Sequence, residues 1–446
     1  MHIARLEISG IRGFYGDRSV DLDLTRPDGS LAGWTVVAGR NASGKSTLLQ
    51  ALGLALAGPG STSFIPNLYS WINTDASNAD IKATITISEE DSFQETLIPV
   101  RPVAWMHFQK FHQLTLNGDP EPVEPQVTGE GLDVQVRIQG GSLSRSVGWF
   151  YSGYGPFRHM GAIVTSRNRR SSLPKRAQQV SSLFDESISL ADAVDWLIDQ
   201  RLLQFENRPG AASLLNTVVA LLNDGLLPDG FRVSSVSSEG LMVTHRGHNF
   251  ALRDMSDGYR AVTALVVDIV RQMNSAYHGD LRLAEGQEGL ALSYPGVVLI
   301  DEIDAHLHVS WQKVIGTWLK QHFPKIQFIV TTHSPYICQS ADPGGLVILP
   351  GPGESRAPYI SDQELYERVV YGSSDDTLLS ALFGVETPYS TEGEKLRQRL
   401  SELEVRMLDG TASVAEVGEY KTLSERLSSS LGARADEVMA RLRREP

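Results

Sequence analysis

Several features that define other protein classes are scarce or missing in this 446-residue sequence. It has one cysteine, Cys338, so no disulfide bond can form within the chain. No run approaches the ~20 uninterrupted apolar residues that cross a bilayer. The first ten residues, MHIARLEISG, lack the apolar core of a signal peptide. We therefore expect a protein with no membrane segment that works in the reducing cytoplasm.

Histidine is missing from the C-terminal part of the chain. All eleven histidines lie at or before His333. Because an HNH-type nuclease needs histidine as base and metal ligand, residues 351–446 cannot hold one. These residues also show no strand followed by acidic residues, the pattern expected of a metal-binding Toprim domain. The sequence therefore gives the tail no recognisable catalytic centre of its own.

Positive charge is also in short supply. The formal net charge is −13, from 40 lysines and arginines against 53 acidic residues. This balance argues against a protein that coats nucleic acid, although it leaves room for a local basic patch. Hydrophobic residues make up 41% and charged residues 21%, as in ordinary globular proteins that bury a sizeable core. The length corresponds to two or three domains.

The stretch GRNASGKST, residues 39–47, matches the phosphate-binding pattern G-x-x-x-x-G-K-[ST]. Gly39 and Gly44 allow the tight turn that points backbone amides at phosphate oxygens. Lys45 supplies a positive charge for the β- and γ-phosphates, and the Ser46 hydroxyl can ligate Mg²⁺. The expected nucleotide-binding residues of this loop are Gly39, Arg40, Asn41, Ala42, Ser43, Gly44, Lys45, Ser46 and Thr47.

The segments on either side of this loop suit the same role. The apolar stretch 34–38 predicts a short buried strand, and residues 46–56 predict a helix. The loop would therefore deliver phosphate to a helix N-terminus, where the helix dipole favours negative charge. A chance match in a Gly/Ser-rich loop would not be expected to have a strand before it and a helix after it.

Residues 296–308 read GVVLIDEIDAHLH. Four apolar β-formers predict a buried parallel strand that ends in Asp301 and Glu302, and α/β sheets place ligand chemistry at such strand ends. Asp301 suits the carboxylate on the Mg²⁺ side, and Glu302 suits the base that orients an attacking water. A solvated turn would look the same in isolation, but the phosphate loop elsewhere in the chain favours the catalytic interpretation.

Two further stretches are compatible with this chemistry. Residues 326–335, IQFIVTTHSP, predict another buried strand that ends near His333. That histidine either contacts the γ-phosphate or is an ordinary structural side chain. Residues 253–261, RDMSDGYRA, predict the start of a long helix at Ser256 and Gly258. Such a start either binds an anion or is simply a good N-cap.

Alternation of apolar and polar residues predicts an antiparallel sheet beside the parallel one. The alternating segments are 4–8, 20–24, 81–87 and 132–138. Between the two halves of the core we expect an inserted helical lobe at about 160–255, with one helix starting at Ser189 and another over 212–223. A basic loop precedes these helices, and it either contacts DNA or is a solvated loop. Its basic residues are Arg167, Arg169, Arg170, Lys175 and Arg176.

The ordered set GRNASGKS, MSDGYR, VVLIDEID and VTTHSP resembles the ABC-type ATPases of the SMC/RecF class. Within that class it resembles the stand-alone ATPases of anti-phage defence, the Septu PtuA-like proteins and the ATPase half of OLD nucleases. The resemblance covers residues 1 to about 350 and extends weakly into DDTLLSALFG. It implies an α/β fold in which a mixed β-sheet phosphate-loop core carries an antiparallel β layer, and it implies ATP and Mg²⁺ as cofactors.

The resemblance also assigns roles to individual residues. By resemblance the catalytic residues are Lys45, Glu302 and His333, and the metal ligands are Ser46 and Asp301. Ser256 and Gly258 of the signature motif would contact the γ-phosphate held by the phosphate loop of another subunit, and Asp304 would act across the same interface. The usual Q-loop glutamine is not identifiable. Arg158, in YGPFR, either takes its place or is structural.

We therefore expect an ATP-binding and hydrolysing switch that forms a homodimer or higher oligomer through ATP. Its expected output is control of a separately encoded effector in anti-phage defence, an HNH-type nuclease by resemblance. The alternative is a RecF-like repair ATPase that grips DNA. A transporter subunit fits poorly, because the signature reads MSDGY where transporters usually read LSGGQ.

The expected domains are an ATPase at 1–350 and a C-terminal helical region at 351–446. Leucines and a methionine recur at helical spacing in that region. The first stripe is Leu396, Leu400, Leu403 and Met407, and the second is Leu423, Leu427 and Leu431. Such stripes either pack within their own domain or form a docking surface for a partner protein.

Overall fold

The computed structural model describes residues 1–65, 67–89, 91, 103–114, 120–130, 149–158, 177–277, 279, 281–286, 289–380, 382–385 and 387–427. The chain divides into two compact units, Met1–Gly384 and Val385–Pro446. The residues between 351 and 384 therefore belong with the first unit, whereas the sequence suggested an ATPase that ends near residue 350. Among the helices that the structure describes, none has the length and apolarity that a membrane crossing requires.

A six-stranded sheet in the order β16-β15-β3-β14-β13-β7 forms the centre of the first unit. Its strands are β3 (Trp34–Ala38), β7 (Phe150–Tyr154), β13 (Gly296–Ile300), β14 (Ile326–Thr331), β15 (Leu346–Ile348) and β16 (Tyr359–Ile360). All pair in parallel except β16, which is antiparallel to β15. Every residue of the five parallel strands is buried, which fits their mostly apolar sequences.

The register of the central sheet brings the expected functional segments together. Ile300 of β13 pairs with Val330 of β14 and with Tyr154 of β7, and Thr331 pairs with Val37 of β3. Because these strands are parallel, the residues that follow each of them lie at the same sheet edge. The phosphate loop and the segments that follow β7, β13 and β14 therefore share one edge of the sheet.

A second sheet, in the order β2-β1-β4-β5-β6, is antiparallel. Its strands are β1 (His2–Ser9), β2 (Val20–Asp23), β4 (Asn78–Thr86), β5 (Val103–Leu114) and β6 (Pro120–Glu130). Helix α1 (Lys45–Ala57) contacts strands of both sheets, and one apolar core joins all three. The antiparallel layer is thus confirmed for the first three alternating segments, while 132–138 lies outside the described residues.

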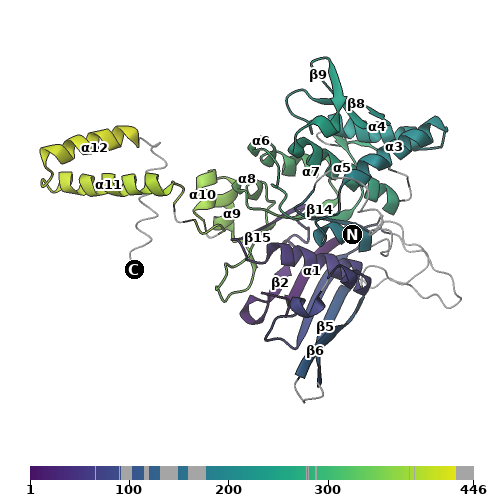
Figure 1. Ribbon diagram of the computed structural model, residues 1–446, viewed down its shortest axis with the longest axis horizontal. Helices are drawn as coiled ribbons and strands as arrows, with labels where there is room; N and C mark the ends of the chain where they lie inside the picture. The colour runs from purple at the N-terminus through teal and green to yellow at the C-terminus, as the bar shows by residue number, and fades with distance from the viewer. Residues whose placement is uncertain are drawn as a thin grey trace. The chain divides into compact units, whose positions relative to one another are not determined.

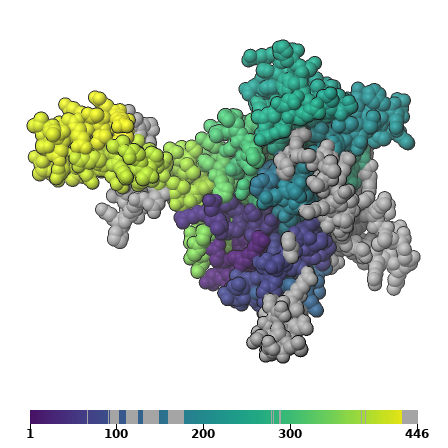
Figure 2. Space-filling view, viewed as in Figure 1, coloured from purple at the N-terminus to yellow at the C-terminus, as the bar shows by residue number. Residues whose placement is uncertain are grey.

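The other face of the central sheet is covered by helices and by the lobe (Figure 1). The helices are α3 (Ala191–Phe205), α4 (Ala211–Asn223), α5 (Asp257–Ala276), α6 (Val309–Gln312) and α7 (Ile315–His322). The lobe also contains a three-stranded sheet of β8 (Arg232–Ser237), β9 (Gly240–His245) and β10 (His248–Ala251). It is therefore mixed rather than purely helical. In Figure 2 the N-terminal segments in purple and the lobe in teal occupy different parts of this unit's surface.

Short elements complete the first unit. The 3-10 turns are η1 (Gly16–Arg18), η2 (Pro59–Phe64), η3 (Leu68–Trp71), η4 (Ala177–Leu183) and η5 (Leu252–Asp254). A small hairpin consists of β11 (Ala284–Gly286) and β12 (Gly289–Ala291), and the remaining helices are α8 (Pro335–Cys338), α9 (Gln363–Val370) and α10 (Ser374–Leu378). The buried side chains of Tyr366 and Val369 join α9 to the core of the first unit.

The second unit contains two helices, α11 (Thr391–Leu408) and α12 (Val414–Arg426). They contact each other and bury Leu403 and Leu423, which confirms the helical prediction for this part of the tail. Arg399 of α11 forms an ion pair with Glu419 of α12, with an Nη2–Oε2 distance of 2.8 Å. Met407 of the first stripe is exposed, and Leu431 of the second lies outside the described residues.

Candidate nucleotide-binding site

The phosphate loop has the backbone that its glycines predict. Gly44 has a φ of 105° and is the N-cap of α1, a left-handed conformation that favours glycine. A Cβ added at Gly44 would lie 2.7 Å from the ring of Phe14. The loop can therefore pass under Phe14 only because this position has no side chain. The N-terminal amides of α1 are left at the loop, where an anion can accept from them.

A cavity of about 510 Å³ opens over this loop, within the size range of small-molecule sites. It is lined by Arg12, Gly13, Phe14, Arg18, Asn41, Ala42, Ser43, Gly44, Lys45, Ser46, Thr47, Glu302 and His333. The structure therefore brings seven expected loop residues together with two residues from the ends of β13 and β14. The seven loop residues are consecutive, 41–47, whereas Glu302 and His333 lie more than 250 positions further along the chain.

Lys45 is 6% exposed, and its Nζ donates hydrogen bonds to the carbonyl oxygens of Gly39 at 2.9 Å and Arg40 at 3.1 Å. Burial lowers the pKa of Lys45, while the carboxylates of Glu302, Asp301 and Asp304 oppose that shift. The ammonium group is thus held at the cavity by its own loop. Phosphate oxygens can replace these carbonyls as acceptors without a large movement of the side chain.

A chain of hydrogen bonds fixes the acidic pair after β13. The hydroxyl of Thr331 donates to Oδ1 of Asp301 at 2.5 Å and accepts from the backbone N–H of Glu302 at 2.7 Å. Asp301 is 3% exposed, whereas Glu302 reaches the cavity. Glu302 has a φ of 46°, a conformation that costs about 1–3 kcal/mol outside glycine and often marks functional sites. The neighbouring carboxylates therefore have different positions, one buried in the turn and one at the cavity.

His333 also lines the cavity. Burial is the main cause that lowers the pKa of His333, and the charge of Lys45 adds to it. This shift favours the neutral imidazole, which can donate or accept a hydrogen bond. Its backbone N–H donates to Oδ1 of Asp304 at 3.3 Å, and Thr332 Oγ1 donates to the same oxygen at 2.5 Å. Asp304 thus anchors the turn before His333 rather than the cavity itself.

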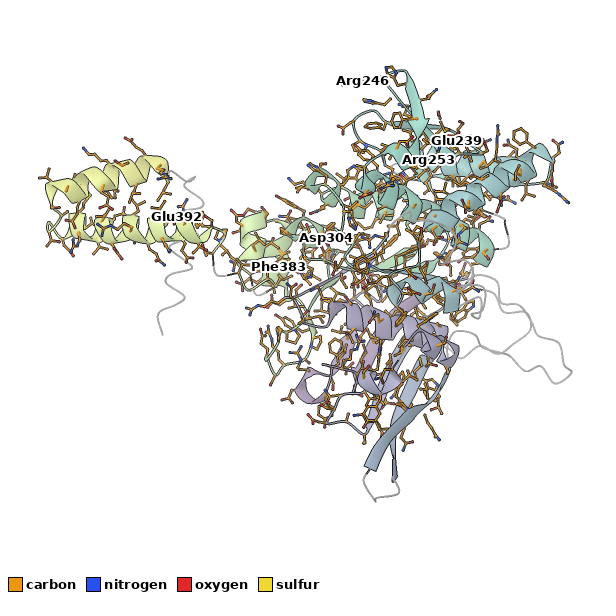
Figure 3. The ribbon with its side chains drawn as sticks, in the orientation of Figure 1. Glu239, Arg246, Arg253, Asp304, Phe383 and Glu392 are labelled. Carbon is orange, nitrogen blue, oxygen red and sulfur yellow. The ribbon has the colours of Figure 1, made fainter. Side chains whose placement is uncertain are left out.

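The signature residues Ser256 and Gly258 lie at the start of α5 rather than at the cavity. Ser256 is the exposed N-cap of α5 and makes no side-chain capping hydrogen bond. A Cβ added at Gly258 would lie 2.6 Å from the carbonyl oxygen of His306. Neither Ser256 nor Gly258 is among the described residues that line the cavity, and neither is Asp304. In Figure 3, Asp304 is labelled apart from Glu239 and Arg253, which lie on the lobe. The roles of these residues across an interface stay predictions.

Arg158 is buried and does not line the cavity. Its guanidinium donates to the carbonyl oxygens of Gly155 at 2.9 Å, Asp301 at 2.6 Å and Glu302 at 2.7 Å. Of the two readings open from the sequence, these contacts favour a structural role over direct replacement of a Q-loop glutamine. The basic loop at 167–176 lies outside the described residues.

Two arginines of the cavity escaped the sequence analysis. Arg12 lies over the ring of Trp71, 4.6 Å from the centroid, and burial lowers its pKa. Arg18 donates to the carbonyl oxygens of Gly351 at 2.8 Å and Glu354 at 2.7 Å. Both follow β1 in a glycine-rich turn, GIRGFYGDR, and that clustering of basic residues with glycine was the only available signal.

The described residues suit a magnesium ion that is bound mainly by a nucleotide. They contain no group of three or more His, Cys, Asp or Glu side chains arranged to hold a metal by themselves. Mg²⁺ prefers oxygen ligands and commonly takes only one or two from the protein, with phosphates and water supplying the rest. The Ser46 hydroxyl at the cavity and the Asp301 carboxylate beneath it provide such oxygens.

Several known proteins are similar to this chain in sequence. The family model described as "AAA domain, putative AbiEii toxin, Type IV TA system" matches residues 34–339. The Septu protein PtuA of Bacillus mycoides (strain KBAB4) is 25% identical over 94% of this chain and 50% of its own length. The Retron Ec83 probable ATPase of Escherichia coli is 32% identical over 36% of this chain and 27% of its own. The chain thus spans half or less of these two relatives.

Among solved structures, the SmcHead bound to the C-winged helix domain of ScpA is similar over 78% of this chain and 93% of its own, at 17% identity and a TM-score of 0.43. The matched family segment runs from β3 to just past α8, so it includes the phosphate loop, the acidic pair and His333. The chain belongs to the family described as "AAA domain, putative AbiEii toxin, Type IV TA system", and it carries an ATPase domain.

Proposed function

We propose that this ATPase works as a nucleotide-driven switch, in which ATP joins two copies of the chain and the joined state controls a separate effector protein. The observation that carries the proposal is the split of the expected site. The loop, Glu302 and His333 meet at one cavity, whereas Ser256 and Gly258 lie elsewhere on the same chain. Because Ser256 and Gly258 do not line the cavity of their own chain, a second copy would supply them.

In this proposal each residue at the cavity has its own role in phosphoryl transfer. Lys45 and the amides at the N-terminus of α1 hold the β- and γ-phosphates. Ser46 and Asp301 would hold Mg²⁺, which supplies charge neutralisation on the phosphate oxygens when bound. Glu302 orients water for in-line attack and accepts its proton, and the neutral His333 donates a hydrogen bond toward the γ-phosphate. Asp301 remains beneath the cavity, because Thr331 fixes it there.

The output is proposed from the relatives and from the tail. Proteins named Septu PtuA and retron ATPase are similar to this chain, which supports a role in anti-phage defence. The helical pair α11–α12 exposes Val405, Leu408 and Val414, so apolar surface remains available there for another protein. We propose that residues from about 388 onward dock the effector, an HNH-type nuclease.

Sedimentation velocity tests the switch directly. The full-length chain should be monomeric with Mg²⁺ and ADP, and dimeric or larger with Mg²⁺ and a non-hydrolysable ATP analogue. Lys45→Ala should remain monomeric with either nucleotide, because it removes the charge that holds the γ-phosphate. Parental ATP hydrolysis by a species that stays monomeric in ATP would overturn the proposal.

A further inference from the structure

Arg158 is an unusual residue for a buried position, because its hydrogen bonds go to backbone carbonyls rather than to carboxylates. It is 5% exposed, and its bonds reach Gly155, Asp301 and Glu302 at 2.6–2.9 Å. Burial lowers the pKa of Arg158 to about 10, although the nearby carboxylates oppose the shift. Burying a charged group without hydrogen-bond partners is costly. The three carbonyl acceptors are therefore what allows Arg158 to be buried here.

Two of those acceptors flank Glu302, a cavity residue with a left-handed backbone. Arg158 donates through Nη1 to the carbonyl of Asp301 and through Nη2 to the carbonyl of Glu302. The N–H of Glu302 donates to the hydroxyl of Thr331. The peptide groups on both sides of the Glu302 Cα are therefore fixed, and Glu302 is the residue with a φ of 46°. A left-handed conformation persists only where its surroundings determine it this strongly.

The chemistry of arginine suits this task better than that of lysine. A planar guanidinium presents two parallel donors, so one side chain can meet two successive carbonyls at once. An ammonium group is a single point and would hold one carbonyl well. The two-carbonyl contact fixes the direction in which the peptide plane between Asp301 and Glu302 faces, and therefore the direction of the Glu302 side chain.

The segment that supplies Arg158 is itself held in place. Tyr154, at the end of β7, accepts the backbone N–H of Asp301 at 2.8 Å. Its hydroxyl donates to Oδ2 of Asp268 on α5 at 3.0 Å, and Gln272 donates to the same oxygen at 2.6 Å. All of these groups are buried. The turn from Tyr154 to Arg158 is thus anchored on the helix that begins at the signature motif.

We propose that Arg158 is a positioning residue that keeps Glu302 in its left-handed conformation, with the carboxylate directed into the cavity. This inference rests on the proposed function, because it assumes that Glu302 orients the attacking water. Arg158 itself does not line the cavity. Its loss should therefore reduce turnover while leaving nucleotide affinity almost unchanged.

The test uses the full-length chain with Arg158→Met, which keeps much of the side-chain volume, and Arg158→Lys. We expect Arg158→Met to lower kcat for ATP by about tenfold or more, with KM and the Kd of a fluorescent ATP analogue within about threefold of the parent. The kcat of Arg158→Lys should lie between those of the parent and Arg158→Met, because one carbonyl keeps a donor. Arg26→Met is the matched control: Arg26 donates to the carbonyl of Pro343 at 2.7 Å, away from the cavity, and its kcat should not change.

A double variant separates positioning from a general loss of structure. If Arg158 acts through Glu302, then Glu302→Gln with Arg158→Met should hydrolyse ATP no more slowly than Glu302→Gln alone. A further tenfold loss in the double variant would overturn the proposal, as would unchanged kcat in Arg158→Met. Should Arg158→Met fail to fold, Arg158→Lys in the same two backgrounds decides the question. Parental hydrolysis by Glu302→Gln alone would instead remove Glu302 from the mechanism, and with it the proposed function.

Discussion

The phosphate-loop half and the signature half of the expected site differ in how far one chain completes them. At the phosphate loop, Lys45 already has two acceptors, and Glu302 is directed to the cavity. At the signature motif, Ser256 is exposed and caps α5 without a side-chain bond. The first half is preorganised for its ligand within one chain, whereas the second offers donors to something outside it. This difference is what a site shared between two subunits requires.

The two halves are nevertheless connected within the chain. Gly258 lies against the carbonyl of His306, four residues after Glu302 in sequence. His306 has a φ of 65°, so it is in a left-handed conformation, as Glu302 is. On the other side, α5 is bonded through Asp268 to Tyr154, which holds Asp301. A change at the signature motif can thus reach the acidic pair through two packed contacts.

The largest effect is expected from blocking the signature half alone. Ser256→Arg places a long cation on an exposed helix start and leaves the cavity untouched. It should abolish measurable ATP hydrolysis but leave the Kd for ATP unchanged within about threefold. Mixing it in equal amounts with Lys45→Ala should restore part of the parental rate, because a mixed dimer has one intact site of two.

Steady-state hydrolysis of the two variants, separately and mixed, measures this recovery. Subunit exchange must be shown by mass or by fluorescence transfer between labelled chains. If mixed dimers form and no activity returns, the site is not shared between two chains, and the proposed difference between its two halves is wrong.

The next effect concerns the phosphate-loop half. Glu302→Gln keeps the shape of the side chain but removes the base, so hydrolysis should fall by about 10²-fold or more. ATP binding should remain, and the ATP-bound assembly should last longer, which light scattering after rapid mixing can follow. Glu239→Gln, on an exposed side chain at the lobe (Figure 3), is the control for a neutralised glutamate.

A smaller effect is expected from disturbing the contact between the halves. Gly258→Ala would bring a Cβ within 2.6 Å of the His306 carbonyl, so the signature turn or the stretch after Glu302 must shift. We expect a loss of about tenfold in kcat, equivalent to ~1.4 kcal/mol in the barrier, with nucleotide affinity preserved. Gly418→Ala on α12 makes the same change where nothing lies within 4 Å, and its rate should not fall. Equal rates in both variants would mean that the contact carries no coupling.

Much of the central sheet could be predicted because its strands are short apolar runs followed by polar residues. The strand 34–38, the strand before Asp301 and the strand before His333 were all found in this way, and their shared edge follows from parallel pairing. The lobe sheet was missed because β8 and β10 contribute few apolar residues; Ser234 and Ser235 interrupt β8. Period-two reasoning has little to count in strands of four to six residues.

The finer parts of the site were beyond sequence reasoning for a different reason. Arg18 bonds to carbonyls more than 330 positions away, and Arg158 bonds to carbonyls more than 140 positions away. Backbone carbonyls carry no residue type, so no motif records such contacts. The left-handed conformation of Glu302 is likewise a property of its surroundings, because glutamate by itself does not favour it.

The smallest effect on ATP chemistry is expected from removing the tail. Both halves of the site lie in Met1–Gly384, as do the contacts that join them. Gly384 has a φ of 57°, and a Cβ added there would collide with the guanidinium of Arg40 in the phosphate loop. Because Gly384 packs this closely against the loop, a truncation should begin after Gly384. Deleting residues 388–446 should change the Kd for ATP by less than about twofold, as measured by titration with a fluorescent analogue.

The same truncation should abolish co-purification of the effector and protection against phage in cells, because the tail is proposed to dock that partner. The matched control is a full-length chain with Leu408→Ser and Val414→Ser, which removes two of the most exposed apolar side chains of the second unit, 84% and 92% exposed, without shortening the chain. It should weaken partner binding and leave folding intact, since neither side chain is buried. If the truncated chain still binds the partner at full affinity, the docking surface lies in the ATPase unit. If it loses ATP binding instead, the tail supports the phosphate-loop half, and the two halves of the site are not complete within the first unit.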